Sequence, residues 1–205
     1  MPKWILYGII FIIYSSLNYS WAETIVKGGE VIKVLYYPEG SVQAEIPQRH
    51  GKRDGLMKLY YPDGSLKEEV NYEQGLLEGE RKFYDENGNI KEERSYVNDE
   101  LSGIAKSYYE NGVVKVETPY KDGLQEGMAR FYYEDGTLAM EVPYEAGKRQ
   151  GVAKRYREGG QLYLEESYDN DNEEGTWKYY TTDGELWKEE IYHNGEMVER
   201  KNLKE

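Results

Sequence analysis

The sequence contains no cysteine and only two histidines, His50 and His193, among its 205 residues. Without thiols the chain has no disulfide framework, no thiolate nucleophile and no cysteine ligands for zinc. The two histidines lie 143 residues apart, and no zinc-ligand spacing, Gly-x-Ser-x-Gly motif or Walker motif is present. We therefore predict that the protein is not an enzyme and has no catalytic residue, metal site or cofactor.

Basic residues are also scarce, with 26 Lys and Arg against 39 Asp and Glu and a formal net charge of −13. Nucleic acids and anionic lipids are bound by clusters of Lys and Arg. We therefore expect no nucleic-acid partner and no binding to anionic membrane lipids. A large charge of one sign favours solubility and repulsion between copies.

Long apolar runs are missing except at the N-terminus. Lys3 precedes an apolar stretch from Trp4 to Leu17, and the small residues Ser20 and Ala22 follow it. This layout is typical of a secretory signal peptide cleaved after Ala22. The stretch is shorter than the roughly 20 residues that span a bilayer, and an uncleaved N-terminal anchor is the alternative. We predict residues 1–22 as a signal peptide and an exported protein that is periplasmic, cell-surface or secreted.

Glycine and tyrosine recur with a fixed period of 24 residues. The period is marked by the glycines Gly40, Gly64, Gly88, Gly112, Gly136, Gly160 and Gly184. Asp or Asn directly precedes five of them, which is the strongest short-range signal for a β-hairpin turn. Frequent glycine together with abundant Tyr, Val and Thr excludes helices.

A fixed period of this length is the signature of a repeat architecture. We predict an all-β fold, an elongated twisted antiparallel β-meander of seven tandem β-hairpins. Residues 31–198 form the repeat domain, 23–30 a lead-in, and 199–205 a charged C-terminal tail without a further strand. The first copy differs from the others in its basic loop, Arg49-His50-Gly51-Lys52-Arg53.

Side-chain alternation along a strand indicates which residues share a face of the sheet. Positions in each copy are counted from the turn glycine, which is position zero. Position −4 is always tyrosine, position +2 always aliphatic, and position +8 tyrosine in six copies. A three-residue loop with a left-handed glycine pairs −4 with +2. Because all three offsets are even, we predict that these columns share one face and that the −4 tyrosines form most of the core.

Position +5 is glutamate in every copy, and alternation places this column on the opposite face. The column consists of Glu45, Glu69, Glu93, Glu117, Glu141, Glu165 and Glu189. Neighbouring members lie about 9.6 Å apart, which is too far for two carboxylates to share a metal ion. The column is either a structural carboxylate needed once per copy or an acidic ladder for a basic partner.

The segment Tyr120-Lys121-Asp122-Gly123-Leu124-Gln125-Glu126-Gly127, followed by Phe131-Tyr132-Tyr133-Glu134-Asp135-Gly136, resembles the MORN repeat. It is most similar to the bacterial variant found in proteins labelled YwqK-type antitoxins, and the resemblance runs from Val31 to about Val198. The second glycine of the better-known repeat is replaced here by residues such as Met57 and Trp177. The resemblance implies a twisted antiparallel sheet that serves interaction and assembly without catalysis.

Aromatic residues at positions −3 and +3 are candidates for partner binding, because exposed aromatic side chains mark interaction sites. They are Tyr37, Tyr61, Tyr109, Tyr133, Tyr163 and Trp187. Specificity is expected where the copies differ, as at Ala139 against Tyr163 and Trp187.

Three functions follow as hypotheses. The first is an exported scaffold that binds an unknown protein partner in the cell envelope. The second is an antitoxin or immunity protein that neutralises a partner toxin. The third is a cell-wall glycan-binding module, suggested by Trp187 and the −3 tyrosines.

Overall fold

The computed structural model describes residues 21–27 and 30–203, and every regular element in them is a β-strand. No helix in this part of the chain is long and apolar enough to cross a membrane. Most of the predicted signal peptide lies outside the described residues. The chain divides into two compact units, residues 1–100 and 101–205, which are described separately.

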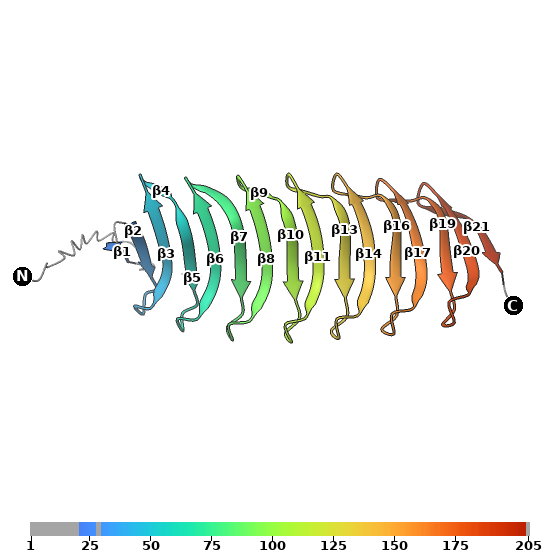
Figure 1. Cartoon of the computed structure of the whole chain (residues 1–205), viewed down its shortest axis with the longest axis horizontal. Coiled ribbons are helices and arrows are strands. Elements are labelled where there is room, and N and C mark those ends of the chain that lie inside the picture. Colours follow the sequence, from blue (N-terminus) through green and yellow to red (C-terminus); the bar gives the residue numbers. More distant parts are fainter. Residues whose placement is uncertain (1–20, 28–29, 204–205) are drawn as a thin grey trace, which may run out of the picture. The chain divides into compact units, whose positions relative to one another are not determined.

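The first unit is an antiparallel meander in which each strand pairs with the next long strand along the chain (Figure 1). Its strands are β1 (Ala22–Lys27), β2 (Glu30–Tyr36), β3 (Val42–Arg49), β4 (Lys52–Arg53), β5 (Gly55–Tyr60), β6 (Leu66–Glu73), β7 (Leu76–Tyr84) and β8 (Ile90–Val97). The two-residue strand β9 (Glu100–Leu101) lies where the units meet in sequence.

The second unit has the same antiparallel order. Its strands are β10 (Gly103–Tyr108), β11 (Val114–Lys121), β12 (Leu124–Gln125), β13 (Gly127–Tyr132), β14 (Leu138–Glu145), β15 (Lys148–Arg149), β16 (Gly151–Tyr156), β17 (Leu162–Asp169), β18 (Asn172–Glu173), β19 (Gly175–Tyr180), β20 (Leu186–His193) and β21 (Glu196–Asn202). The predicted all-β antiparallel meander of hairpins is confirmed.

The hairpin turn is the predicted three-residue loop. In the second copy, the Tyr61 N–H donates to Ser65 O, and the Gly64 N–H donates to Tyr61 O, both at 2.9 Å. Gly64 has φ +90, a left-handed conformation that glycine adopts without steric cost. The loop pairs Tyr60 with Leu66, so the expected pairing of −4 with +2 is confirmed.

A β-bulge follows this turn in every hairpin and changes which side chains share a face. In the fifth copy Tyr132 pairs with Leu138 and Phe131 pairs with Met140, so Ala139 at position +3 has no residue opposite it. The extra residue reverses the alternation beyond it. Position +5 therefore joins −4 and +2 on one face, which we call the tyrosine–glutamate face. Positions +4, +6 and +8 lie on the other, which we call the core face.

The predicted assignment of faces was therefore wrong, because simple alternation takes no account of the unpaired residue. The −4 tyrosines are only half-buried, and position +8 lies on the opposite face from them. With the exception of Val34, all buried side chains belong to positions −7, +4, +6 and +8 of the core face. The apolar ones are Ala44, Val70, Tyr96, Ala129, Val142, Ala153, Tyr168 and Trp177.

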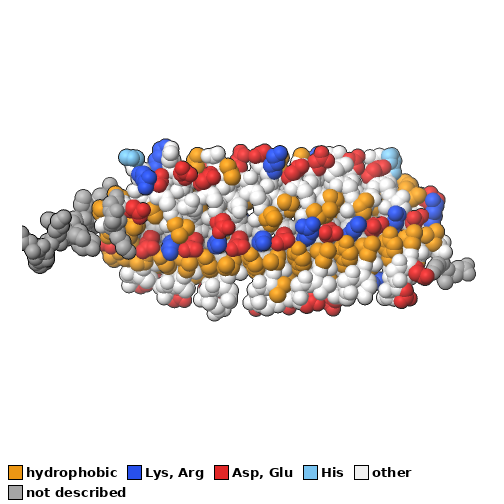
Figure 2. All heavy atoms as spheres, viewed as in Figure 1, with side chains coloured by type: hydrophobic (Ala, Val, Ile, Leu, Met, Phe, Trp, Pro, Cys, Tyr) orange, Lys and Arg blue, Asp and Glu red, His pale blue; other side chains and the backbone are white. Residues whose placement is uncertain are grey.

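On the tyrosine–glutamate face, the glutamates are bonded to the tyrosines of the next copy. Tyr60 Oη donates to Glu45 at 2.8 Å, and the same bond recurs at 2.9–3.2 Å from Tyr84, Tyr132, Tyr156 and Tyr180. Burial and the hydrogen bond to Glu45 raise the pKa of Tyr60 to about 12. Figure 2 shows in each unit a hydrophobic row beside a row in which acidic and basic side chains alternate. The five carboxylates in these bonds therefore have a structural role.

The segments before and after the hairpins also form strands, which the sequence analysis did not anticipate. β1 includes most of the predicted lead-in and pairs with β2, and the Trp21 ring stacks on Tyr36 with centroids 3.7 Å apart. β21 includes part of the predicted charged tail and pairs with β20. The backbone N–H and C=O groups of β1 and β21 form hydrogen bonds with the neighbouring strand. The charged composition of these segments alone does not indicate this pairing.

The core face also contains a buried carboxylate, Glu190, whose side chain is 4% exposed. Tyr179 Oη donates to it at 2.6 Å, Lys188 Nζ at 3.2 Å and Arg200 Nε at 2.8 Å. Burial alone would raise the pKa of Glu190, but these donors outweigh burial and hold the pKa below its usual value of 4.5. The ionised form therefore stabilises the folded state.

We predict that Glu190→Gln lowers the free energy of unfolding by about 2 kcal/mol at neutral pH, because three charge-assisted bonds are weakened. A lowered folded-state pKa gives stability that is complete above the unfolded pKa and is lost as pH falls through the folded pKa. Denaturant titrations between pH 7 and pH 3 should therefore show that the free energy of unfolding of the wild type falls below about pH 4.5. The fall should be smaller in the variant. The same pH dependence in both proteins would contradict this role.

Candidate functional site

The four candidate tyrosines at position −3 serve first to hold neighbouring hairpins together. Their hydroxyls donate to the carbonyl oxygen of the −4 tyrosine in the following copy, at 2.7–2.8 Å. The donors are Tyr37, Tyr61, Tyr109 and Tyr133. Each bond satisfies a backbone carbonyl at the turn end of the next hairpin, so the hydroxyl has a structural role and only the ring is left to meet a ligand.

The unpaired bulge residue packs a cation against the −3 ring of its own hairpin. Lys67 Nζ lies 5.5 Å from the ring centroid of Tyr61, and Lys115 Nζ lies 5.3 Å from that of Tyr109. In the sixth copy the two residue types are exchanged, because Arg157 stands at −3 and Tyr163 at +3, 5.0 Å apart. Arg157 also donates to Tyr180 O at 3.3 Å, and so replaces the tyrosine bridge.

The fifth copy breaks this pattern because its bulge residue is Ala139. Its short side chain leaves a hollow of 290 Å³ over the hairpins of the fourth to sixth copies. The rings of Tyr109, Tyr133 and Tyr163 line this hollow, so three of the six candidates come together. Val116, Phe131 and Met140 also line it. We call this the aromatic hollow.

The charges at the aromatic hollow are basic. Lys115 and Arg155 line it, and among the described lining residues there is no carboxylate. Arg155 Nε donates to the buried Glu166 at 2.7 Å, so its charge is already compensated. Lys115 is exposed and forms no ion pair with the described part of the chain. The hollow therefore offers aromatic rings, an apolar floor and one available cation.

The other candidates do not line the hollow. Tyr37 and Tyr61 belong to the first unit. Trp187 is 38% exposed, and its ring meets Tyr179 edge-on with centroids 6.4 Å apart, beside Lys188 Nζ at 5.4 Å. Tyr109, Tyr133 and Tyr163 therefore share one hollow, and Trp187 lies outside its lining.

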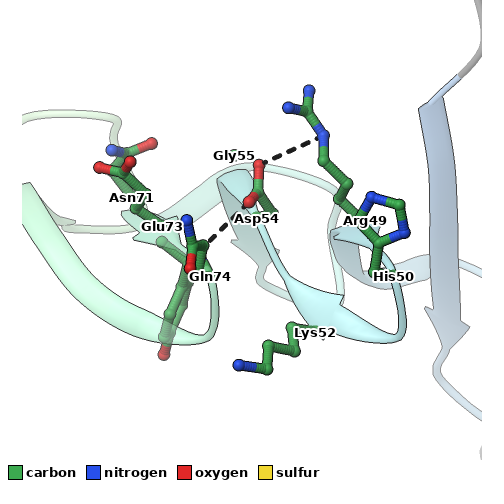
Figure 3. A pocket seen from close by; sticks show the side chains of 9 residues that line it. Arg49, His50, Lys52, Asp54, Gly55, Asn71, Glu73 and Gln74 are labelled. Atoms are coloured by element: carbon green, nitrogen blue, oxygen red, sulfur yellow. Dashed lines mark hydrogen bonds and ion pairs between the residues drawn. The ribbon is translucent and has the colours of Figure 1, made fainter.

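Sequence reasoning missed Met140 and Lys115 as members of one site. The signal for it was Ala139 itself, a small residue in a column that elsewhere holds Gln43, Lys67, Lys91, Lys115, Tyr163 and Trp187. A second pocket, of 670 Å³, lies at the loop end of the first unit beside Arg49, His50 and Lys52 (Figure 3). The described residues contain no cluster of His, Asp and Glu that could hold a metal ion.

Tandem hairpins with one register, joined by repeated side-chain bridges, define a repeat scaffold for interaction. The family model for the MORN repeat variant matches residues 53–74, 77–98, 101–122, 125–146, 149–170 and 173–199. These windows cover more than half of the sequence, and the chain belongs to this family. No curated protein matches the chain. The expected first copy lies largely before these windows, although β2 and β3 pair with the same register and bulge as the other hairpins.

We predict that Tyr133→Phe lowers the free energy of unfolding by about 1 kcal/mol, because the carbonyl of Tyr156 loses its donor. Tyr163→Phe is the matched control, since the Tyr163 hydroxyl has no hydrogen bond within the described residues and its ring is retained. Denaturant titration of the two variants measures the difference. Equal stability of both variants would show that the bridge does not stabilise the fold.

Proposed function

We propose that the protein is an exported, non-catalytic scaffold whose second unit binds a partner protein at the aromatic hollow. The observation that carries the proposal is the hollow opened by Ala139 between three tyrosine rings. Protein interfaces are anchored by a few well-enclosed apolar side chains, and aromatic residues are enriched at such points.

The size of the hollow favours one anchoring side chain over a whole small molecule. Its 290 Å³ falls at the lower limit of pockets for drug-sized ligands, which hold about 300–1,000 Å³. The exposed Lys115 at its edge attracts an acid, and no carboxylate lines the hollow itself, although Glu110 and Glu134 line the adjoining pocket that Lys115 shares. The partner is therefore an extended protein segment with a large apolar side chain next to an acidic one.

Export rests on the residues before Glu23, where a basic start, an apolar stretch and small residues succeed one another. Neutralisation of an envelope toxin would be a specific form of the same proposal, with the toxin as the partner. Glycan binding centred on Trp187 is the competing function, since sugars stack on exposed aromatic rings and Trp187 lies outside the lining of the hollow.

The substitution that tests the proposal is Ala139→Lys, which gives the fifth copy the residue found in the second to fourth. Lysine at this bulge packs over the −3 tyrosine in the second and fourth copies, so the fold should accept it and the hollow should fill. We expect quantitative pull-downs from envelope fractions to lose the bound partner by at least about tenfold, as for a hot spot. Ala146→Lys is the matched control, because it adds the same charge at an exposed position in the loop of the same copy.

Equal recovery of the partner by Ala139→Lys and the wild type would contradict the proposal, and so would equal loss in both lysine variants. Binding to cell-wall glycan that Trp187→Ala weakens and Ala139→Lys leaves unchanged would favour the glycan-binding function instead. For a toxin partner, co-expression with Ala139→Lys should fail to protect cells that the wild type protects.

A further inference from the structure

The loops opposite the hairpin turns stack on one another through a repeated backbone hydrogen bond. In the first unit, the Gly75 N–H donates to Arg53 O at 2.7 Å. In the second unit, the Asp171 N–H donates to Arg149 O at 3.1 Å in the same arrangement. Arg53 and Arg149 occupy equivalent positions in their copies, 96 residues or four periods apart. Their surroundings can therefore be compared directly.

Arg149 is held by a carboxylate of the following loop. Asp171 Oδ1 accepts from the Arg149 backbone N–H at 2.9 Å and from its Nε at 3.2 Å, and Nη2 donates to Asp171 O at 3.0 Å. The guanidinium lies over the ring of Tyr168, 4.1 Å from its centroid. Leu77 N–H has the same kind of partner in Asp99 Oδ1, at 2.7 Å. The loop geometry thus forms a carboxylate site wherever aspartate occupies this position.

Arg53 has the same arrangement without the carboxylate. Its guanidinium lies 4.3 Å from the ring centroid of Tyr72, and Nη1 donates to Tyr72 Oη at 2.8 Å. The residue equivalent to Asp171 is Gly75, which has no side chain. The three atoms nearest to a Cβ added at Gly75 belong to the stem of Lys52, at 3.7–3.9 Å, which is ordinary contact, so the position has room for a ligand atom.

The pocket beside this site is lined by two cations and two acids. Arg49 and Lys52 line the pocket beside His50, and all three are exposed (Figure 3). Of the two acids that line it, Asp54 accepts from the Gln74 N–H at 3.2 Å and lies 3.8 Å from Arg49 Nε. The other is Glu73, which is exposed. Arg49 and Lys52 balance these two acids, and Arg53, which lies beside the pocket without lining it, leaves an excess of one positive charge.

We propose that this loop pocket binds a carboxylate from an acidic segment of another protein, in the position that Asp171 Oδ1 takes beside Arg149. A planar guanidinium pre-oriented on an aromatic ring matches a carboxylate with two parallel donors. The chain's net charge of −13 repels extended polyanions such as nucleic acid or an anionic membrane, whereas a short acidic segment meets mainly the local cations. The site lies in the first unit and does not depend on the aromatic hollow.

The test uses Gly75→Asp, which supplies the carboxylate from within the chain. Asp99 and Asp171 adopt φ 70 at the equivalent position and Gly75 has φ +97, so the loop accepts aspartate after a backbone shift toward the geometry of those two copies. The probe is a fluorescein-labelled peptide of alternating Glu and Gly, measured by fluorescence anisotropy at low salt, with Gln in place of Glu as its control. We expect the wild type to bind the Glu peptide and Gly75→Asp to bind it at least about tenfold more weakly, as for the loss of a charged hydrogen bond.

Gly123→Asp is the matched control, because it places aspartate at the same loop position next to Leu101 instead of an arginine. We expect it to bind the peptide like the wild type. Arg53→Lys keeps the charge but loses the planar fork, and should also weaken binding about tenfold without changing the loop backbone. If Gly75→Asp does not fold, wild-type binding by Arg53→Lys would overturn the proposal.

No binding of the Glu peptide, equal binding of the Gln peptide, or equal weakening by Gly123→Asp would overturn the proposal. The wild type could instead bind anionic phospholipid vesicles and not the peptide. If Gly75→Asp abolished that binding, the proposal would be overturned in favour of a lipid headgroup as the ligand. Competition by millimolar inorganic phosphate together with loss in Gly75→Asp supports an anion site, and the Glu-over-Gln preference then identifies the carboxylate.

Discussion

The unpaired residue after each hairpin turn is the constraint on which the rest of the structure depends. It reverses the side-chain alternation between positions +2 and +4, and so brings the +5 glutamates to the same face as the −4 tyrosines of the next copy. The opposite face then collects the small, apolar and paired charged side chains that form the core. The same residue projects its side chain at the turn end of the hairpin, where it packs on the −3 ring. One extra residue per copy therefore determines both the core and the surface that a partner meets.

Residues that recur in every copy build the hairpins, and the two proposed binding sites lie at positions where the copies differ. Ala139 stands where other copies have a long side chain, and Gly75 stands where the sixth loop has Asp171. In each case another copy shows what fills the position when it is occupied: Lys115 over Tyr109 in one case, and Asp171 against Arg149 in the other. In a tandem repeat, an open site can therefore be compared with an occupied copy of the same site in the same chain.

The period, the three-residue turn and the antiparallel meander could be predicted from the sequence. Glycine, and Asp-Gly or Asn-Gly pairs, favour the left-handed backbone conformation that hairpin turns require. The faces could not be predicted, because a bulge adds one residue to the spacing and leaves the 24-residue period unchanged. The candidate aromatic residues were chosen by type, and only Tyr109, Tyr133 and Tyr163 share a site. Their grouping depends on which side chain fills position +3 in the neighbouring copies. The loop pocket was visible only as a basic segment, since the missing partner of Arg53 is apparent only when the stacked loops are compared.

A double-mutant cycle between Tyr60 and Glu45 tests most directly whether the bulge brings these two columns together. The wild type, Tyr60→Phe, Glu45→Ala and the double variant are compared by the free energy of unfolding, with Tyr37→Phe in place of Tyr60→Phe as a control cycle. Tyr60 Oη and Glu45 are 2.8 Å apart, whereas Tyr37 Oη donates to Tyr60 O. The structure predicts a coupling energy of about 1 kcal/mol for Tyr60 and Glu45, and none for Tyr37 and Glu45. A coupling of zero for Tyr60 and Glu45 would mean that they lie on opposite faces, and would contradict the account.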